Sequence, residues 1–202
     1  MNHPKEEITF MMIKPDGVMR GLTGEIVKRV ERVGLKIVAL KMYKPEVKQV
    51  DDHYPKDEAW ITRLGNKTLT TYEKFGYDAM KELGTNKAEE IGPHVRQWLI
   101  DFMVSGPVVV MAIKGPHAVA MIRKLAGPTM PSDAEMGTIR GDFSVDSAAA
   151  ANRDKRAVMN IVHASETQDE AKHEIQHWFG EGETLWDYER SDEMVMYPKP
   201  KN

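Results

Sequence analysis

The groups best suited to chemistry in this sequence are one histidine and a few cations. No cysteine is present, which excludes disulfides, thiolate zinc sites and cysteine nucleophiles. Among the seven histidines, His163 differs because it closes an apolar run and directly precedes Ala164-Ser165-Glu166. Side chains at the end of a rigid strand often point into a functional site. Taken alone, His163 is still better explained as a structural residue, and the others as solvated or helix-capping residues: His3, His53, His94, His117, His173 and His177.

Three cations could serve one substrate together with this histidine. Lys14 ends the first apolar run, Arg123 lies on a predicted helix that faces a long loop, and Arg140 lies in a glycine-containing stretch, residues 137–143. Several cations beside one histidine suit a polyphosphate substrate, because a transferred phosphoryl group carries negative charge on its oxygens. Each cation taken singly is an ordinary surface charge. Together with His163 they favour phosphoryl transfer.

Four strands and the helices between them must position these side chains. Apolar runs and alternation predict strands at Ile8–Ile13, Leu35–Met42, Val108–Ile113 and Val158–His163. Apolar residues at helical spacing predict helices over residues 26–33, 46–54, 95–104, 116–126, 144–156 and 166–179. We expect a turn at residues 14–17, a polar stretch at 55–92 with only brief helical patterns such as Thr70–Met80, and a long loop at 128–143. This order favours an α+β fold, a βαββαβ sandwich in which helices cover one face of a four-stranded antiparallel sheet.

Length and charge narrow the class of protein further. A chain of 202 residues is enough for one domain with its own core. The net charge of −3 argues against tight binding to nucleic acid or to an acidic membrane. The longest apolar runs are far shorter than the roughly 18 residues of a membrane helix, and no signal peptide is visible. We therefore expect a soluble, cytoplasmic, single-domain protein.

Several short motifs, in order, resemble those of nucleoside diphosphate kinases. They are Met12-Ile13-Lys14-Pro15-Asp16-Gly17-Val18, Arg20-Gly21-Leu22, Gly24-Glu25-Ile26, His53-Tyr54, Ser105-Gly106-Pro107-Val108, Gly137-Thr138-Ile139-Arg140-Gly141-Asp142-Phe143, Asn160-Ile161-Val162-His163-Ala164-Ser165 and Ala171 to Trp178-Phe179. The resemblance extends over residues 7–54, 95–143 and 157–197. It implies a ferredoxin-like βαββαβ sheet, in agreement with the pattern of strands and helices.

The resemblance also implies a role for each matched residue. His163 corresponds to the histidine that takes the γ-phosphate of a nucleoside triphosphate and gives it to a diphosphate, in a ping-pong mechanism. Glu174 corresponds to the carboxylate that holds the other ring nitrogen, and Ser165 would contact that carboxylate or the phosphate. The matched phosphate and ribose ligands are Lys14, Tyr54, Arg123, Thr129, Arg140 and Asn160. Mg²⁺ would arrive on the nucleotide phosphates with few or no protein ligands, and relatives form hexamers or tetramers.

The sequence departs from the family pattern at two predicted insertions, about residues 55–93 and 144–156. The aromatic residue that stacks on the base is expected near Val95, where no aromatic residue stands. Either Trp60, Tyr72 or Trp98 replaces it, or stacking on the base is weaker. No matched residue contacts a base edge, so we expect low discrimination among bases. The matched ligands contact phosphate or sugar, and we also expect tolerance of ribo- and deoxyribonucleotides.

Two other functions are weighed against this one. A non-catalytic nucleotide-binding regulatory module would be signalled by loss of the histidine, the lysine or the glutamate, but His163, Lys14 and Glu174 are all present. An RNA-binding module would need exposed aromatic residues on its central strands, and Ile8–Ile13 and Val108–Ile113 hold only Phe10. A purely structural role leaves the cations around His163 unexplained.

Overall fold

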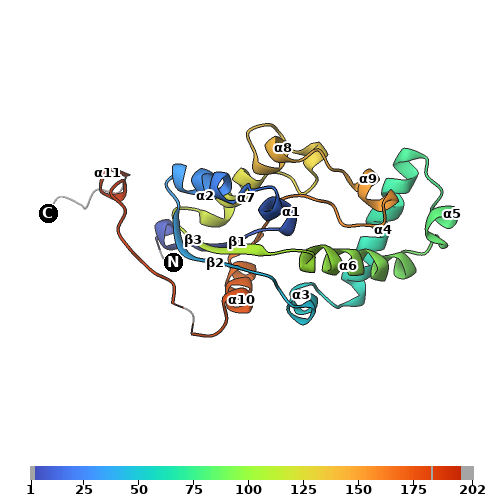
Figure 1. Ribbon diagram of the computed structural model, residues 1–202, viewed down its shortest axis with the longest axis horizontal. Helices are drawn as coiled ribbons and strands as arrows, with labels where there is room; N and C mark the ends of the chain where they lie inside the picture. Colours follow the sequence, from blue (N-terminus) through green and yellow to red (C-terminus); the bar gives the residue numbers. More distant parts are fainter. Residues whose placement is uncertain (1–2, 183, 197–202) are drawn as a thin grey trace.

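The computed structural model describes residues 3–182 and 184–196, and its centre is one antiparallel sheet (Figure 1). The strands are β1 (Ile8–Ile13), β2 (Lys36–Tyr43), β3 (Val108–Lys114) and β4 (Val162–Ala164), in the order β2-β3-β1-β4. β3 and β4 both run antiparallel to β1, and β2 runs antiparallel to β3. The predicted α+β fold with a ferredoxin-like sheet is therefore confirmed. The last residue of the matched stretches, Tyr197, lies outside the described residues.

Helices cover both faces of this sheet, so the expectation of one covered face is wrong. One face carries α2 (Thr23–Arg32) and α7 (Ala118–Ala126), and the other carries α3 (Val47–His53), α6 (Ala88–Val104) and α10 (Gln168–Phe179) (Figure 1). The reason is in the strands, because β1 and β3 are buried along almost their whole length. A strand that is apolar at every position has two faces to cover.

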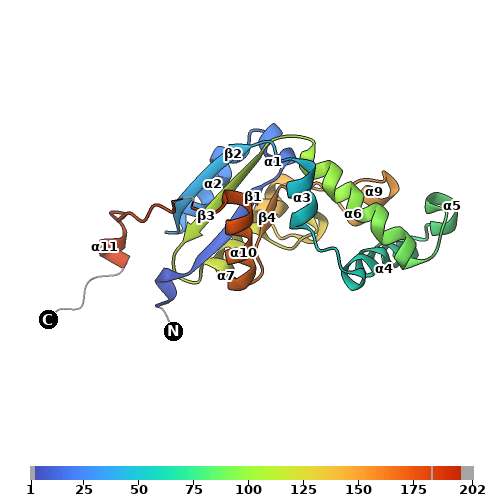
Figure 2. The same cartoon turned by 90° about the horizontal axis from the view of Figure 1, so that it is seen from below.

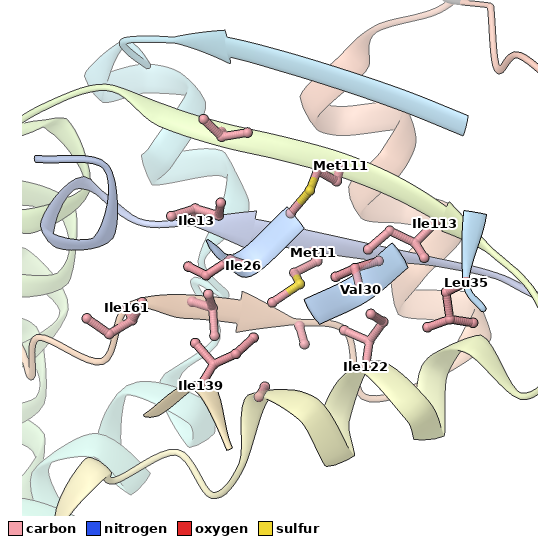
Figure 3. Packing of buried hydrophobic residues seen from close by; sticks show 14 of the residues in the cluster. Met11, Ile13, Ile26, Val30, Leu35, Met111, Ile113, Ile122, Ile139 and Ile161 are labelled. Atoms are coloured by element: carbon pink, nitrogen blue, oxygen red, sulfur yellow. The ribbon is translucent and has the colours of Figure 1, made fainter. Parts of the chain in front are cut away.

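Alternate residues of β1 belong to two separate hydrophobic clusters. Met11 and Ile13 pack with residues of α2 and α7 such as Ile26 and Ile122 (Figure 3). Phe10 and Met12 face the other way and pack with residues of α3, α6 and α10, namely Val50, Met103 and Trp178. This follows from the two-residue period of a strand. The two clusters make β1 and β3 a rigid base for the residues that follow them.

Several boundaries differ from the predicted ones. The expected turn at residues 14–17 is a short helix, α1 (Pro15–Met19), with proline at its first position. α7 begins at Ala118 instead of Pro116, because His117 has a φ of 52°. The expected loop at 128–143 contains a 3-10 turn at Pro131–Asp133 and the helix α8 (Ile139–Phe143). β4 begins at Val162 instead of Val158, because Ile161 has a φ of 67°, which no strand residue adopts.

The polar stretch after residue 55 is far more helical than predicted. It forms α4 (Glu58–Phe75) and α5 (Ala79–Leu83), and α4 packs along α6. A Cβ at Gly65 would overlap the carbonyl oxygen of Ala88, and one at Gly92 would overlap that of Ile61. These two glycines, which the sequence suggested were loop residues, therefore allow the backbones of α4 and α6 to come into contact.

The two predicted insertions meet in space. The short helix α9 (Ala148–Arg153) packs on α4, where the Tyr72 hydroxyl donates to Glu82 (3.2 Å) and to the Asn152 carbonyl (3.5 Å). Figure 2 shows α4, α5 and α6 at one end of the sheet and α11 (Glu193–Met196) beyond the opposite end. A 3-10 turn at Pro4–Glu6 precedes β1. None of the helices in the described part of the chain combines the length and the apolarity needed to cross a membrane.

Candidate active site

His163 lies on the edge strand β4, opposite Met12 of β1. Its Nε2 is 2.6 Å from Oε1 of Glu174, and the Ser165 hydroxyl donates to Oε2 of the same carboxylate at 2.5 Å. Glu174 and Ser165 are buried, whereas a quarter of the His163 side chain is exposed. Because an ionised carboxylate only accepts hydrogen bonds, Nε2 carries the proton and Nδ1 keeps its lone pair. This is the tautomer that a nucleophilic imidazole needs.

The helix α10 supplies the carboxylate because of its amphipathic spacing. Thr167 caps the helix by accepting from the Glu170 amide at 3.1 Å. Ala171, Glu174 and Trp178 then follow at spacings of three and four residues, so all three lie on the buried face. Glu174 thus replaces one apolar residue in the face that packs on the sheet.

His53 also belongs to this cluster, and the prediction that it is solvated or capping is wrong. Its side chain is 9% exposed, and its ring lies edge-on to that of His163 with centroids 5.3 Å apart. The indole Nε1 of Trp178 donates to Nδ1 of His53 at 3.3 Å. Burial and the nearby His163 hold the pKa of His53 well below its usual range, so it stays neutral. The signal that could have found it was the His53-Tyr54 pair among the motifs shared with the family.

The cationic residues form a second group around Asn160. The Lys14 ammonium donates to Oδ1 of Asn160 at 2.8 Å, and the Asn160 amide donates to the Thr129 carbonyl at 3.0 Å. Burial and the charge of Arg140 lower the pKa of Lys14 to about 8. Lys14 is thus a cation held in an unfavourable environment, which an anion at this site would relieve.

The Arg140 side chain forms its hydrogen bonds with backbone carbonyls close to Asn160. Its guanidinium donates to the carbonyls of Gly127 (2.6 Å), Asn160 (3.2 Å) and Val162 (2.7 Å). Burial and the charge of Arg123 lower its pKa to about 10. Arg140 therefore ties the start of β4 to the loop after α7.

Two cavities open on either side of β4. One, of about 630 Å³, is lined by Tyr54, Trp60, His163 and Glu174 among others, and we call it the histidine cavity. The other, of about 300 Å³, is lined by residues that include Arg123, Thr129, Arg140 and Ala164, and we call it the arginine cavity. Successive residues of a strand face opposite sides, so His163 faces the first and Ala164 the second.

The predicted site residues are thus only partly brought together. His163, Glu174 and Ser165 form one hydrogen-bonded group, and Lys14, Asn160, Thr129 and Arg140 form another. Tyr54 lies in the histidine cavity. Arg123 stays at the exposed rim of the arginine cavity, 3.4 Å from Glu166.

The structure also separates the three aromatic candidates for stacking on a base. Trp60 stacks on Tyr54 with ring centroids 6.1 Å apart and lines the histidine cavity. Tyr72 is fully buried where α4 packs on α9, and Trp98 lines neither cavity. Trp60 is therefore the candidate that the geometry retains.

A ring nitrogen that keeps its lone pair and a separate group of buried cations both suit phosphoryl transfer, which is the chemistry of a phosphotransferase. The family model described as "Nucleoside diphosphate kinase" matches residues 7–61 and 87–184. The chain therefore belongs to the nucleoside diphosphate kinase family. The unmatched residues 62–86 fall within the predicted insertion at 55–93, whereas 144–156 lies in the matched range.

Individual relatives agree with this assignment. A nucleoside diphosphate kinase from Pyrobaculum aerophilum is 47% identical over 179 residues, covering 89% of this chain and 98% of the relative. The crystal structure of an NDP kinase from that organism superposes with a TM-score of 0.85 at 44% identity, covering 90% of this chain and 99% of that one. A transition state mimic of the Borrelia burgdorferi enzyme, with bound vanadate and ADP, gives a TM-score of 0.73 at 34% identity, covering 94% and 95%. The Halobacterium salinarum enzyme in complex with CDP gives 0.65 at 30% identity, covering 95% and 99%.

Proposed function

We propose that this chain transfers the γ-phosphate of a nucleoside triphosphate such as ATP to nucleoside diphosphates, through a phosphohistidine on Nδ1 of His163. The observation that carries this is the 2.6 Å contact between Nε2 and the buried Glu174, which leaves Nδ1 as the nucleophilic nitrogen. A buried carboxylate also stabilises the positive charge that the ring gains when Nδ1 bonds to phosphorus.

The reaction has two equivalent halves. In the first, the Nδ1 lone pair attacks the γ-phosphorus in line, the bond from phosphorus to the bridging oxygen breaks, and the nucleoside diphosphate leaves with that electron pair. In the second, a terminal oxygen of another nucleoside diphosphate attacks the phosphohistidine, and Nδ1 regains its lone pair. Neutral imidazole suits both steps, because it is nucleophilic near pH 7 and its phosphoryl adduct is reactive.

The other matched residues bind the nucleotide in this proposal. Lys14, Arg123 and Arg140 neutralise the phosphate charge, and Asn160 binds the sugar hydroxyls. Tyr54 and Thr129 donate hydroxyl hydrogen bonds. The low pKa of Lys14 supports its part, because a buried ammonium that forms no ion pair with a carboxylate among the described residues gains most from an anion.

Mg²⁺ belongs to the substrate in this proposal. Within the described residues, the group that could hold a metal ion is His53, His163 and Glu174. Two imidazole nitrogens are poor ligands for Mg²⁺, which prefers oxygen and keeps its water. The ion would therefore be carried by the nucleotide phosphates.

The stacking residue in this proposal is Trp60. It lies in the histidine cavity beside Tyr54 and offers a flat face rather than hydrogen bonds to base edges. Stacking of this kind tolerates every base, which supports low discrimination among bases and tolerance of ribo- and deoxyribonucleotides. A relative bound to ADP and another bound to CDP fit this view.

The remaining expectations stay predictions. We propose that residues 1–202 form a single domain with insertions at about 55–93 and 144–156, since one sheet organises both clusters of the core. A homo-oligomer of six or four chains and a cytoplasmic location are further predictions from the resemblance and the composition.

The direct test is a labelling and chase experiment. Wild-type protein, His163→Ala and the control His94→Ala, an exposed histidine on α6, are incubated with Mg²⁺ and γ-labelled ATP and then chased with GDP. We expect acid-labile label on the wild type and on His94→Ala that is discharged as labelled GTP, and none on His163→Ala. Nucleotide binding without labelling of the folded wild type would favour the non-catalytic regulatory module instead.

A further inference from the structure

Ile161 has a backbone conformation that is rare for its residue type. It is fully buried, β-branched and has a φ of 67°. The Val162 amide donates to the Asn160 carbonyl at 2.7 Å, which closes a three-residue turn with Ile161 at its centre. A β-branched residue at positive φ is strained and persists only where its surroundings enforce it. This turn lies two residues before His163.

Contacts from the motif after β1 hold this residue from both sides. Oδ2 of Asp16 accepts from the Ile161 amide at 3.0 Å. The Lys14 amide donates to the Ile161 carbonyl at 2.8 Å. The amide and the carbonyl of Ile161 are thus both hydrogen-bonded to residues 14–16, which lie more than a hundred residues earlier in the sequence.

Gly17 lets this segment come close enough to make those bonds. A Cβ at Gly17 would lie 3.1 Å from both Cγ2 and the carbonyl oxygen of Ile161, and 2.8 Å from Cγ2 of Ile13. Gly17 is helical and has no positive φ, so the need for glycine here is one of space and not of backbone freedom.

The turn connects the two groups of the candidate site. Asn160, which precedes Ile161 in the turn, accepts a hydrogen bond from the Lys14 ammonium. Val162, which follows Ile161, begins the strand that carries His163. Arg140 donates to the carbonyls of both Asn160 and Val162. The conformation of Ile161 therefore sets where the Asn160 amide stands relative to the His163 ring.

We propose that Asp16 and Gly17 are positioning residues, which hold the strained turn at Ile161 and thereby aim the His163 ring at the phosphate that Lys14 binds. This inference rests on the proposed function for its effect on rate. It assigns a task to Asp16 and Gly17, two residues of the Lys14-Pro15-Asp16-Gly17 motif that have no role of their own in the proposed function.

A competing role for Asp16 is electrostatic, as a negative charge near Lys14. The geometry favours the role of hydrogen-bond acceptor. Oδ2 of Asp16 accepts from the Ile161 amide, whereas among the described residues no hydrogen bond or ion pair joins the Asp16 carboxylate to the Lys14 ammonium. Asp16→Asn separates the two roles, because asparagine keeps the acceptor oxygen and loses the charge.

The experiment compares Asp16→Ala and Asp16→Asn with wild type by the single-turnover rate of His163 labelling from γ-labelled ATP. A misplaced nucleophile loses up to about 100-fold in rate, so we expect Asp16→Ala to be slower by about 10- to 100-fold. We expect ADP affinity to change less than about 3-fold and Asp16→Asn to recover most of the rate. Equal loss in both variants would assign the charge role, and a wild-type rate in Asp16→Ala would overturn the proposal.

A second pair of variants covers the case in which Asp16→Ala does not fold. Gly17→Ala is expected to slow labelling, whereas Gly24→Ala, an exposed helical glycine with nothing within 4 Å of its would-be Cβ, keeps the wild-type rate. Equal rates in these two variants would overturn the close-packing role of Gly17.

A readout without activity separates this inference from the proposed function. We expect the ¹⁵N chemical shifts of the His163 ring to move in Asp16→Ala and not in Asp16→Asn. If the wild type takes no label but these shifts move, the proposed function fails and the positioning role stands. If the wild type takes label and neither rate nor shift responds to Asp16→Ala, the positioning role fails alone.

Discussion

The two sides of β4 differ in how far they are built before a nucleotide arrives. On the histidine side, the buried carboxylate of Glu174 already contacts His163, the buried Ser165 hydroxyl and the largely buried His53 ring. On the arginine side, Arg123 and Thr129 are exposed, and Arg123 forms a 3.4 Å ion pair with Glu166, which is also exposed. The chemistry is thus fixed in place in advance, whereas part of the charge that binds the substrate is not. This predicts that changes on the histidine side reduce kcat and changes on the arginine side raise KM.

The largest effect is expected from Glu174→Ala on the histidine side. Loss of a carboxylate that orients a functional histidine costs about 10- to 100-fold in activity. We expect that loss in kcat, with KM changed by less than about 3-fold. Steady-state kinetics with ATP and dTDP measures both. Asp169→Ala, an exposed residue of the same helix, is the control, and a change confined to KM would break the comparison.

Next comes Arg123→Ala on the arginine side. Removing one charge-assisted hydrogen bond to phosphate weakens binding by about tenfold, so we expect KM to rise by that factor with a smaller change in kcat. Lys124→Ala is the matched variant, because Lys124 is exposed and lines the same cavity. Equal effects of the two substitutions would show that only the total charge of the cavity matters.

Lys14, which is hydrogen-bonded to Asn160, gives a prediction on pH. Its pKa of about 8 means that it is cationic below that pH and loses its charge above it. We expect kcat/KM to fall by up to about tenfold per pH unit on the alkaline side. Lys14→Arg keeps its charge, so its kcat/KM, although lower, shows no such alkaline decline. The same decline in Lys14→Arg would assign the titration to another group.

The smallest effect concerns stability on the histidine side. The pKa of His53 is held well below the 6.5 of a free histidine by burial. Between those two values the unfolded chain binds a proton that the folded chain does not, so stability falls as pH drops below 6.5. We expect the corresponding fall in Tm to be smaller in His53→Gln than in wild type, by about 2–4 °C. Thermal unfolding followed by circular dichroism over this range measures it, and parallel curves for the two proteins would contradict the prediction.

How well each element was predicted depends on how much apolar surface it contributes. β1 was predicted at its observed residues and β3 within one residue, because each consists almost entirely of apolar residues and is followed by a proline or glycine within two residues. The long helix α4 was missed because its buried face consists of Gly65, Thr68 and Tyr72, which carry almost no hydrophobic periodicity. Its glycine signals a loop in the sequence, and only the neighbouring backbone of α6 shows that it is a packing contact.

Local patterns and motifs in a fixed order were enough to predict the side chains that suit phosphoryl transfer, the succession of strands and helices along the chain, and the family that the chain resembles. The folded chain was needed to show that His53 lies against His163, that Trp60 lines the same cavity and that Asp16 binds the Ile161 amide. Each of these contacts joins segments about a hundred residues apart or more, so no local pattern in the sequence predicts it.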